Sequence, residues 1–341
     1  MTSEGIAVQT AAPAAPRGRR GRRSADVPAL VAGAREGDAR SVARLISLVE
    51  DASPALRAVA AALSPHTGRA QVIGLTGSPG VGKSTTTTAL VRAFRQAGQR
   101  VGVLAVDPSS PFSGGALLGD RVRMQDHAGD SGVYIRSMAS RGHLGGLAWA
   151  TPQALRVLDA AGCDVVLIET VGVGQSELEV ASLADTTLVL LAPGMGDGIQ
   201  AAKAGILEVA DVFVVNKADR DGADQTVRDL RAMLSLGGRH TQTGAWRPPI
   251  VKTIASRDSG SGVEDVVARI EEHAAWLASS GEDQRRRVER AAREVEAIAL
   301  AGLRERMGDV HGSAALGALA EQVVAGETDP YRAADELVAQ L

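Results

Sequence analysis

The sequence predicts an α/β protein built on a doubly wound, mostly parallel sheet, with N-terminal helices and a C-terminal helical arm. Short apolar runs bounded by turn residues alternate with stretches of helical periodicity, which is typical of strand–helix–strand units. The chain of 341 residues is 45% hydrophobic but only 2% aromatic. Its core must therefore consist mainly of Val, Leu, Ile and Ala, a composition that suits strands buried on both faces.

Each expected strand is a short run rich in aliphatic residues, and in chain order these runs are Val72–Leu75, Val101–Val106, Val133–Ile135, Val165–Ile168, Thr187–Leu191, Val212–Val215 and Ile250–Ile254. Helical stretches such as Ser84–Ala97, Pro152–Ala161 and Gly198–Val209 separate most of them. Ligands of doubly wound sheets bind beyond the carboxyl ends of the strands. Motifs that follow these runs are therefore the candidates for a functional site.

The net charge and the composition of the chain argue against several classes of function. The net charge of −3 gives no general reason to expect nucleic-acid binding. The single cysteine, Cys163, excludes an internal disulfide and favours a reducing compartment. No apolar run approaches the roughly 18 residues that span a bilayer, and the first residues lack the apolar stretch of a secretory signal. We expect a soluble, cytoplasmic protein that binds neither nucleic acid nor membranes.

The loop after the first expected strand carries the full Walker A pattern, which is formed by Gly77, Ser78, Pro79, Gly80, Val81, Gly82, Lys83 and Ser84. Glycines allow successive backbone N–H groups to point at phosphate oxygens, and the start of the next helix adds partial positive charge. We expect Lys83 to bridge the β- and γ-phosphates and the Ser84 hydroxyl to bind Mg²⁺. Thr85 is placed to contact the α-phosphate.

Three acidic residues lie where expected strands meet loops: Asp107, Asp120 and Glu169. Mg²⁺ keeps several waters and takes few carboxylates, so we expect Asp107 and Glu169 near the metal or its waters. Asp120 would join them when its glycine-rich loop closes. Residues 169–172 have the form of the Asp-x-x-Gly element that senses γ-phosphate through the Gly172 N–H, with Glu in place of Asp. Hydrolysis would release these contacts and loosen the loops.

The catalytic residue is less sharply defined by the sequence. Lys83, Glu169 and Gln175 are the candidates, but Gln175 lies three residues beyond Gly172 and not next to it. Hydrolysis of a bound nucleoside triphosphate needs a group that orients water and often a cation for the developing charge. The cations available for this are Arg121, Arg123, Arg141 and Lys203.

A base-selecting motif, Asn216-Lys217-Ala218-Asp219, follows the strand expected at Val212–Val215. The Asp219 carboxylate can accept the N1–H and 2-amino groups of guanine, which adenine lacks, so GTP and GDP are the expected ligands. Lys217 would lay its stem across the base, and Asn216 would brace neighbouring loops. At the end of the last strand, a backbone N–H of Ala255 or Ser256 could reach guanine O6.

These motifs divide the chain into four expected segments. Residues 1–24, rich in Arg and Gly, are expected to be a disordered, solvated tail, with a transit peptide or an anionic-surface contact as alternatives. Residues 25–68 form a helical extension, residues 69–280 a P-loop GTPase domain, and residues 281–341 a helical dimerisation arm. The apolar stripe of this arm must lie either on the domain or against another subunit.

The motifs together resemble the methylmalonyl-CoA mutase-associated GTPases of the MeaB/ArgK type, within the signal-recognition and MinD-like class of P-loop proteins. Beyond the Walker A loop and the guanine motif, the resemblance rests on residues 106–110, 114–124 and 169–177. It implies a GTPase chaperone that couples GTP binding and hydrolysis to delivery of adenosylcobalamin to the mutase, and to protection of that enzyme.

The same resemblance implies a homodimer joined through the C-terminal arm. It further implies that the loop Pro193–Lys203, with Asp197, Gln200 and Lys203, is an extra switch that reports the nucleotide state to the mutase. The arginines of the N-terminal tail are not part of the family pattern.

Two other functions use the same loop. A nickel-insertion GTPase would need Cys and His ligands at metal spacing, and one cysteine with six scattered histidines argues against it. A small-molecule kinase, such as the amino-acid transport kinases once described among these relatives, would need an acceptor site beside the γ-phosphate. No amino-acid pocket is recognisable in the sequence.

Overall fold

A computed structural model gives the fold of residues 26–51, 53–108, 127, 129–140, 150–170, 176–194, 206–236, 244–256, 261–307 and 313–339. Only the backbone is described for several residues at the ends of helices and strands, Asp107 among them. The tail expected at residues 1–24 lies outside the described part of the chain.

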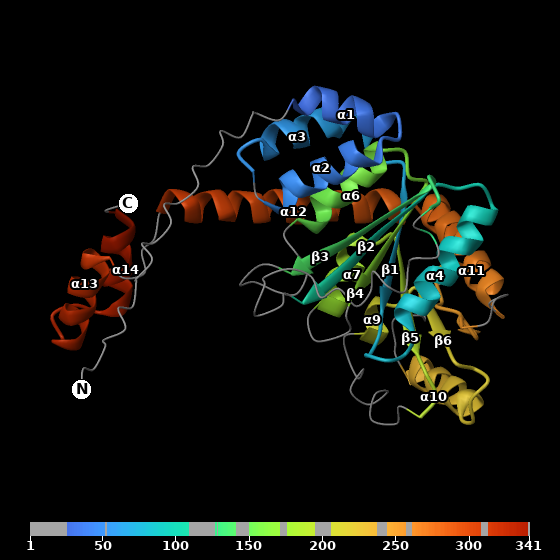
Figure 1. The fold of residues 1–341 in the computed structure, drawn as a ribbon. Helices are drawn as coiled ribbons and strands as arrows, with labels where there is room; N and C mark the ends of the chain where they lie inside the picture. The colour runs from blue at the N-terminus through green and yellow to red at the C-terminus, as the bar shows by residue number, and fades with distance from the viewer. Residues whose placement is uncertain are drawn as a thin grey trace, which may run out of the picture.

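Within the described residues, seven strands form one sheet in the order β3-β2-β4-β1-β5-β6-β7 (Figure 1). The strands are β1 Gln71–Thr76, β2 Val101–Pro108, β3 Val133–Ser140, β4 Val165–Thr170, β5 Thr186–Leu191, β6 Val212–Val215 and β7 Ile250–Lys252. All neighbouring pairs are parallel, which confirms the predicted doubly wound sheet. The last strand is shorter than expected, because the chain turns after Lys252 and Ile254 pairs antiparallel with Ser261.

Helices cover both faces of this sheet. On one face, α4 (Lys83–Gln96) and α11 (Val263–Ser280) pack against aliphatic side chains of the strands. The opposite face carries helices that contribute to three other apolar clusters: α1 Val27–Arg35, α2 Ala39–Glu50, α3 Leu56–Leu63 with the 3₁₀ turn Ser64–His66, α6 Thr151–Ala160, α7 Ser176–Leu183 and α10 Ala223–Leu236. The short helix α9 Ile206–Val209 contacts α7 and β5. Burial on both faces explains why β4, β5 and β6 are rich in aliphatic residues along their whole length.

The helical periodicity of residues 27–63 corresponds to α1, α2 and α3, which lie outside α6 (Figure 1). Asp38 caps α2 by accepting a hydrogen bond from the Ser41 backbone N–H at 2.9 Å. Tyr134 of β3 donates to the Gly37 carbonyl at 2.9 Å, between α1 and α2. The Tyr134 contact joins the turn between α1 and α2 to the edge strand β3.

Carboxylates hold together the amino edge of the sheet, where the strands begin. Asp185 precedes β5 and accepts a hydrogen bond from the Val72 N–H of β1 at 2.8 Å. Asp211 precedes β6 and accepts from the Thr187 N–H of β5, also at 2.8 Å. Each carboxylate therefore satisfies a backbone donor of the neighbouring strand, which would otherwise be buried without a partner.

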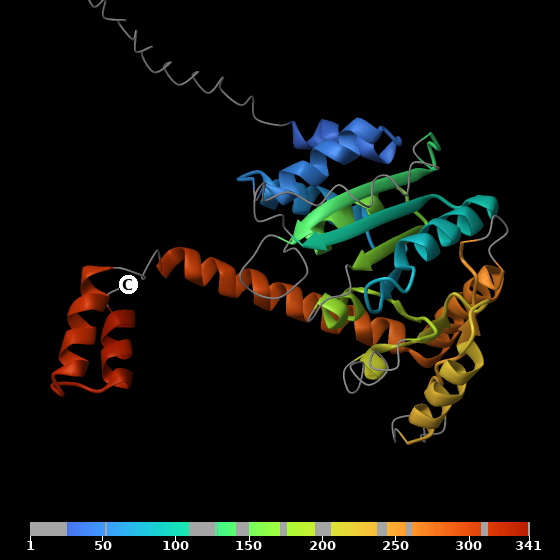
Figure 2. The same cartoon turned by 60° about the horizontal axis from the view of Figure 1, so that its bottom comes forward.

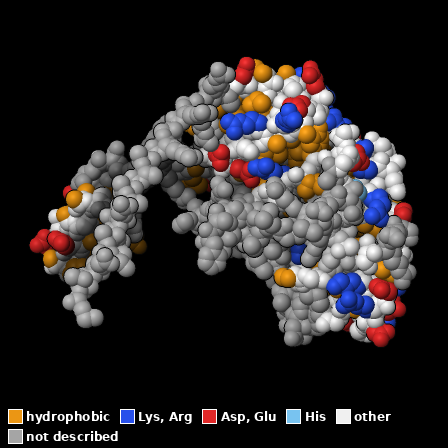
Figure 3. Space-filling view, in the orientation of Figure 1, with side chains coloured by type: hydrophobic (Ala, Val, Ile, Leu, Met, Phe, Trp, Pro, Cys, Tyr) orange, Lys and Arg blue, Asp and Glu red, His pale blue; other side chains and the backbone are white. Residues whose placement is uncertain are grey.

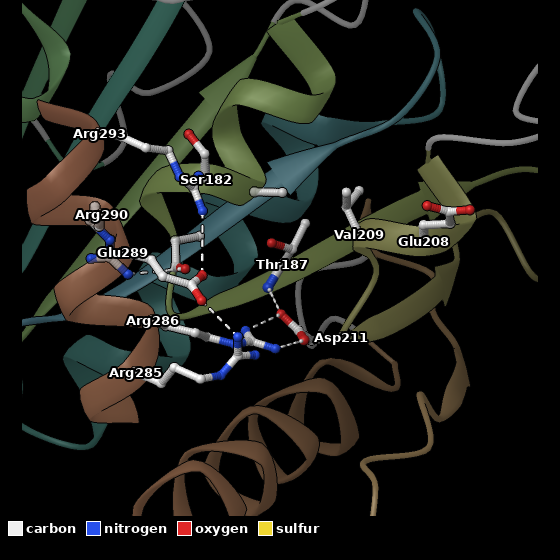
Figure 4. A pocket seen from close by; sticks show the side chains of 12 residues that line it. Ser182, Thr187, Glu208, Val209, Asp211, Arg285, Arg286, Glu289, Arg290 and Arg293 are labelled. Atoms are coloured by element: carbon white, nitrogen blue, oxygen red, sulfur yellow. Dashed lines mark hydrogen bonds and ion pairs between the residues drawn. The ribbon is translucent and has the colours of Figure 1, made fainter. Parts of the chain in front are cut away.

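The same carboxylates anchor α12 (Glu282–Met307), which crosses this edge (Figure 4). Arg290 Nη2 lies 2.8 Å from Asp185 Oδ1, and Arg286 Nη2 lies 3.1 Å from Asp211 Oδ1. Further along, Glu294 pairs with Arg156 of α6. The first half of α12 is thus fixed to the sheet by ion pairs.

A pocket of about 280 Å³ lies between α12 and the helices α7 and α9. Figure 4 shows the side chains of α12 directed into it, with Arg286 facing Asp211. Glu289 Oε1 pairs with Arg285 at 2.7 Å, and Glu289 Oε2 lies 3.6 Å from Arg293. The arginines that line the pocket are paired with carboxylates, so the pocket marks an ion-paired contact between the arm and the domain.

The second half of α12 extends away from the body, and Figures 1 and 2 agree on this. Val295 is 67% exposed and Leu303 54% exposed in the single chain. Beyond them, α13 (Ala314–Val324) and α14 (Pro330–Ala339) form a hairpin whose surface carries hydrophobic side chains (Figure 3). The apolar stripe of α12 is exposed in the single chain in both halves of the helix, since Val288 in the ion-paired first half is itself 57% exposed. No described helix, this one included, is long and apolar enough to cross a membrane.

Asp211→Asn should lower the free energy of unfolding by about 3 kcal/mol at neutral pH, because it breaks a buried ion pair. Burial raises the pKa of the Asp211 carboxyl, but His273 and Arg286 outweigh burial and hold that pKa below its ordinary value. A depressed pKa stabilises the fold above the unfolded-state pKa of about 4, and this stabilisation is lost as the pH falls through the folded-state pKa. Urea denaturation of both proteins between pH 7 and pH 3 should show the difference shrinking on acidification.

Asp224→Asn is the matched control. A hydrogen bond from Lys252 also lowers the pKa of Asp224, but the Asp224 side chain is 75% exposed. Solvent screens such a pair, so its loss should change the stability little at any pH. Equal losses of stability in the two variants would contradict a stabilising role for the buried Asp211 carboxylate. A loss of stability for Asp211→Asn that does not change with pH would contradict it as well.

Candidate nucleotide-binding site

The loop that leaves β1 has a backbone that glycine adopts most readily. Gly77, Gly80 and Gly82 have φ angles of 138°, 80° and 100°. A Cβ atom on Gly77 would lie 2.3 Å from the Leu190 carbonyl oxygen of β5. The absence of a side chain therefore lets the Walker A loop pass directly over the carboxyl end of the neighbouring strand.

Lys83 begins α4 and places its ammonium group inside this loop. Its Nζ donates to the Gly77 carbonyl at 2.7 Å and to the Ser78 carbonyl at 3.1 Å. The side chain is only 7% exposed. The first backbone N–H groups of α4 open at the same end of the sheet. A buried positive charge beside a helix N-terminus makes this loop an electrostatically favourable place for phosphate.

Glu169, near the end of β4, contacts α4 at two consecutive turns. Ser84 Oγ donates to Glu169 Oε1 at 2.5 Å, and Thr87 Oγ1 donates to Glu169 Oε2 at 2.9 Å. The Glu169 side chain is 4% exposed, so these charge-assisted hydrogen bonds form away from bulk water. The first of them joins the expected metal-binding hydroxyl to the expected metal-site carboxylate.

The donor atoms at this point fit a hard divalent cation. A hydroxyl oxygen and a carboxylate beside a phosphate-binding loop are the oxygen ligands that Mg²⁺ accepts, and Mg²⁺ takes few of them from protein. Within the described residues, no group of three or more His, Cys, Asp or Glu side chains is arranged to hold a metal ion. A site for Mg²⁺ here would therefore be completed by phosphate oxygens and water.

Asn216 joins the Walker A loop to the strand ends β6 and β7. Its Nδ2 donates to the Val81 carbonyl at 2.9 Å. Its Oδ1 accepts from Thr253 Oγ1 and from the Ala255 backbone N–H, both at 3.2 Å. Asn216 is 2% exposed, so both ends of its amide are satisfied inside the protein.

The other residues of the base-selecting motif surround this contact. Lys217 has a φ of 57°, uncommon for a residue other than glycine, and its Nζ donates to the Gly80 carbonyl at 2.6 Å. Asp219 is exposed at the same edge, and so is Ser256. Because the Ala255 N–H bonds to Asn216, Ser256 has the freer backbone donor of the two expected at guanine O6.

Several expected site residues cannot be placed. The side chain of Asp107, at the end of β2, is outside the described part of the chain. The remaining predicted residues that lie wholly outside it are Asp120, Gly172, Gln175, Asp197, Gln200 and Lys203, together with the candidate cations Arg121, Arg123 and Arg141. Their roles stay predictions.

The structure also shows two contacts that the sequence analysis missed. Thr87 lies one turn beyond Ser84 on α4, a spacing that places both hydroxyls on one helix face. Thr253, just after β7, is buried and supports Asn216. The helical spacing of Thr87 was a usable signal, whereas the contact of Thr253 depends on how two strand ends meet.

A parallel sheet with this loop after its central strand β1, and the motif Asn216–Asp219 after β6 on the far side of β5, defines the class of P-loop nucleotide-binding proteins. The crystal structure of a protein named LAO/AO transport system kinase superposes on the chain with a TM-score of 0.69 and 25% identity. The match covers 93% of this chain and 98% of that one. The fold is therefore that of a P-loop GTPase.

The family model described as "Methylmalonyl Co-A mutase-associated GTPase MeaB" matches residues 42–310, and the chain belongs to this family of GTPases. A Pyrococcus abyssi protein named "Putative GTPase" is 45% identical over 310 residues, 90% of this chain and 94% of the relative. The mouse protein named "Methylmalonic aciduria type A homolog, mitochondrial" is 40% identical over 213 residues, 62% of this chain and 50% of the relative. The family resemblance seen in the sequence is confirmed.

Gly82→Ala should destabilise the protein by more than about 2 kcal/mol, because it combines an unfavourable φ with a collision. The new Cβ would lie 2.3 Å from Asn216 Nδ2 and displace the amide that joins the loop to β6. Urea denaturation gives the loss of stability, and titration with a fluorescent GDP analogue should show weaker binding.

Gly80→Ala is the matched control. It has a similar φ, but no described heavy atom lies within 4 Å of the added Cβ. Only the cost of placing alanine at a positive φ, about 1 kcal/mol, should remain. Equal losses of stability in both variants would show that the contact between Gly82 and Asn216 is unimportant.

Proposed function

We propose that this chain is a GTP-hydrolysing chaperone that assists the loading of adenosylcobalamin into methylmalonyl-CoA mutase, or a related acyl-CoA mutase, and protects that enzyme. The observation that carries the proposal is the hydrogen-bonded unit of Walker A loop and guanine motif in a member of this GTPase family. The mutase as partner is supported by the description of the family.

In this proposal the residues Gly77–Thr85 bind the phosphates of GTP through backbone N–H groups. Lys83 turns its ammonium from the Gly77 and Ser78 carbonyls to the β- and γ-phosphates. The Ser84 hydroxyl holds Mg²⁺, and Glu169 acts on the metal site through its hydrogen bond with Ser84. Bound Mg²⁺ supplies neutralisation of the charge that develops on the phosphate oxygens.

Guanine is selected at the carboxyl ends of β6 and β7. Asp219 accepts the N1–H and the 2-amino group, and the Ser256 N–H donates to O6. The Lys217 stem covers the base while its Nζ keeps the contact with the Gly80 carbonyl. Adenine would leave the Asp219 carboxylate unpaired, so it is rejected.

The remaining roles follow the sequence predictions. Asp107 and Asp120 complete the surroundings of the metal, Gly172 senses the γ-phosphate, and Gln175 is the candidate that orients water. The mutase reads the nucleotide state through the loop that contains Asp197, Gln200 and Lys203.

A homodimer is part of the same proposal. The second half of α12 presents Val295, Ile298, Leu300 and Leu303 to solvent in the single chain. A helix whose apolar side chains are exposed over successive turns is stabilised by packing against another helix. The arm of a second copy offers the same residues, so the two arms can bury each other.

The alternative is a small-molecule kinase, because the protein of the superposed crystal structure is named an LAO/AO transport system kinase. A kinase transfers the γ-phosphate to an acceptor, whereas the proposed GTPase releases it as inorganic phosphate. The two functions therefore differ in whether the γ-phosphate is transferred to an acceptor or released to water.

Incubation with GTP labelled in the γ-phosphate tests the proposal. With purified adenosylcobalamin-dependent methylmalonyl-CoA mutase added, release of inorganic phosphate should rise at least severalfold. The same mixture with candidate amino acids should yield no phosphorylated product. Lys83→Ala serves as the control for contaminating hydrolases and should remove the signal. Transfer of the labelled phosphate to an amino acid would contradict the chaperone function. A rate of phosphate release that does not change when the mutase is added would also contradict it.

A further inference from the structure

The hydrogen bonds of Thr87 connect the phosphate-binding helix to the acidic residue of the metal site. Thr87 is fully buried on α4. Its Oγ1 lies 2.9 Å from Glu169 Oε2 and 3.1 Å from the Lys83 carbonyl oxygen. One hydroxyl proton thus has two acceptors, a charged one on β4 and a neutral one on its own helix.

The two acceptors differ in strength. A hydrogen bond to an ionised carboxylate is roughly twice as strong as one to a neutral carbonyl, so the proton of Thr87 favours Glu169. When Glu169 moves, the Lys83 carbonyl one turn earlier can take the same proton. Thr87 can therefore hold or release the carboxylate without leaving its own hydroxyl unsatisfied in a dry interior.

The opposite oxygen of the same carboxylate contacts Ser84. With Oε2 held by Thr87, the carboxyl plane of Glu169 is fixed and Oε1 stays aligned with the Ser84 hydroxyl at 2.5 Å. Ser84 and Thr87 are three residues apart on α4, so the helix itself sets the distance between their hydroxyls. The carboxylate is held between two points on one rigid element.

We propose that Thr87 is a positioning residue for the magnesium site, because it fixes Glu169 in the orientation that aligns Ser84 with the metal. This inference rests on the proposed binding of Mg²⁺-GTP at the Walker A loop. In this proposal Thr87 acts through its hydrogen bond to Glu169 and not as a ligand of phosphate or metal. Groups that orient metal-site ligands in this way commonly change metal affinity by about 10- to 100-fold when they are removed.

Thr87→Val tests this, because it replaces the hydroxyl by a methyl group of similar shape. The measurement is the rate at which a fluorescent GDP analogue leaves the protein over a range of Mg²⁺ concentrations, with a parallel series in EDTA. The Mg²⁺ concentration for half-maximal retention should rise about tenfold, and release in EDTA should stay within about twofold of wild type. Thr87→Ser, which keeps the hydroxyl, should restore the wild-type Mg²⁺ dependence.

Thr88→Val is the matched control. Thr88 neighbours Thr87 on α4 and bonds to the Ser84 carbonyl at 3.0 Å, so its replacement should leave the Mg²⁺ dependence unchanged. A normal Mg²⁺ dependence in Thr87→Val would overturn the inference, and so would equal shifts for Thr87→Val and Thr88→Val, or faster release in EDTA. If Thr87→Val does not fold, Thr87→Ala is judged by the same criteria. A wild-type protein that holds the GDP analogue equally with and without Mg²⁺ would overturn the proposed metal site as well.

Discussion

The amide of Asn216 connects the two halves of the nucleotide site. One end binds the Val81 carbonyl in the Walker A loop, and the other accepts hydrogen bonds from Thr253 and Ala255 beyond β7. Because Asn216 is buried, loss of any of these bonds would leave a polar group unsatisfied. The Walker A loop and the residues proposed to select the base are therefore fixed relative to one another before any nucleotide arrives. Preorganisation of this kind lowers the entropic cost of binding.

The two edges of the sheet serve different purposes. At the carboxyl edge, glycines and short loops bring backbone groups, Lys83 and Glu169 to one place. At the amino edge, Asp185 and Asp211 cap neighbouring strands and hold α12 through Arg290 and Arg286. The strand β6 runs from Asp211 at one edge to Asn216 at the other, so the residues that fix the arm and the nucleotide site share one rigid element.

Much of the fold was predictable from the sequence, because parallel strands buried on both faces must be apolar runs. The Walker A loop was predictable because its φ angles favour glycine at defined positions. Other features depend on residues far apart in the chain, such as Thr87 and Glu169 or Asp211 and Arg286. Nothing local distinguishes Asp211 from an aspartate in an ordinary turn. Its carboxylate acquires a role only when α12 folds across the strand that it precedes.

The position of the C-terminal arm was likewise not predictable from the local sequence. Its periodicity indicated an apolar stripe but not where that stripe would lie. In the structure, ion pairs hold the first half of α12, and these depend on arginines between the apolar positions. The second half has no such partners on the domain among the described residues, and its apolar side chains are exposed.

We expect a guanine-selective site to be assembled around the contact between Asn216 and the Walker A loop. Calorimetry of GDP and XDP binding to the wild type and to Asp219→Asn tests it most directly. The variant should bind GDP far more weakly and XDP more tightly than the wild type, since an amide offers a donor where guanine needs an acceptor. A gain for XDP cannot come from misfolding. Unchanged affinities for both nucleotides would contradict the claim.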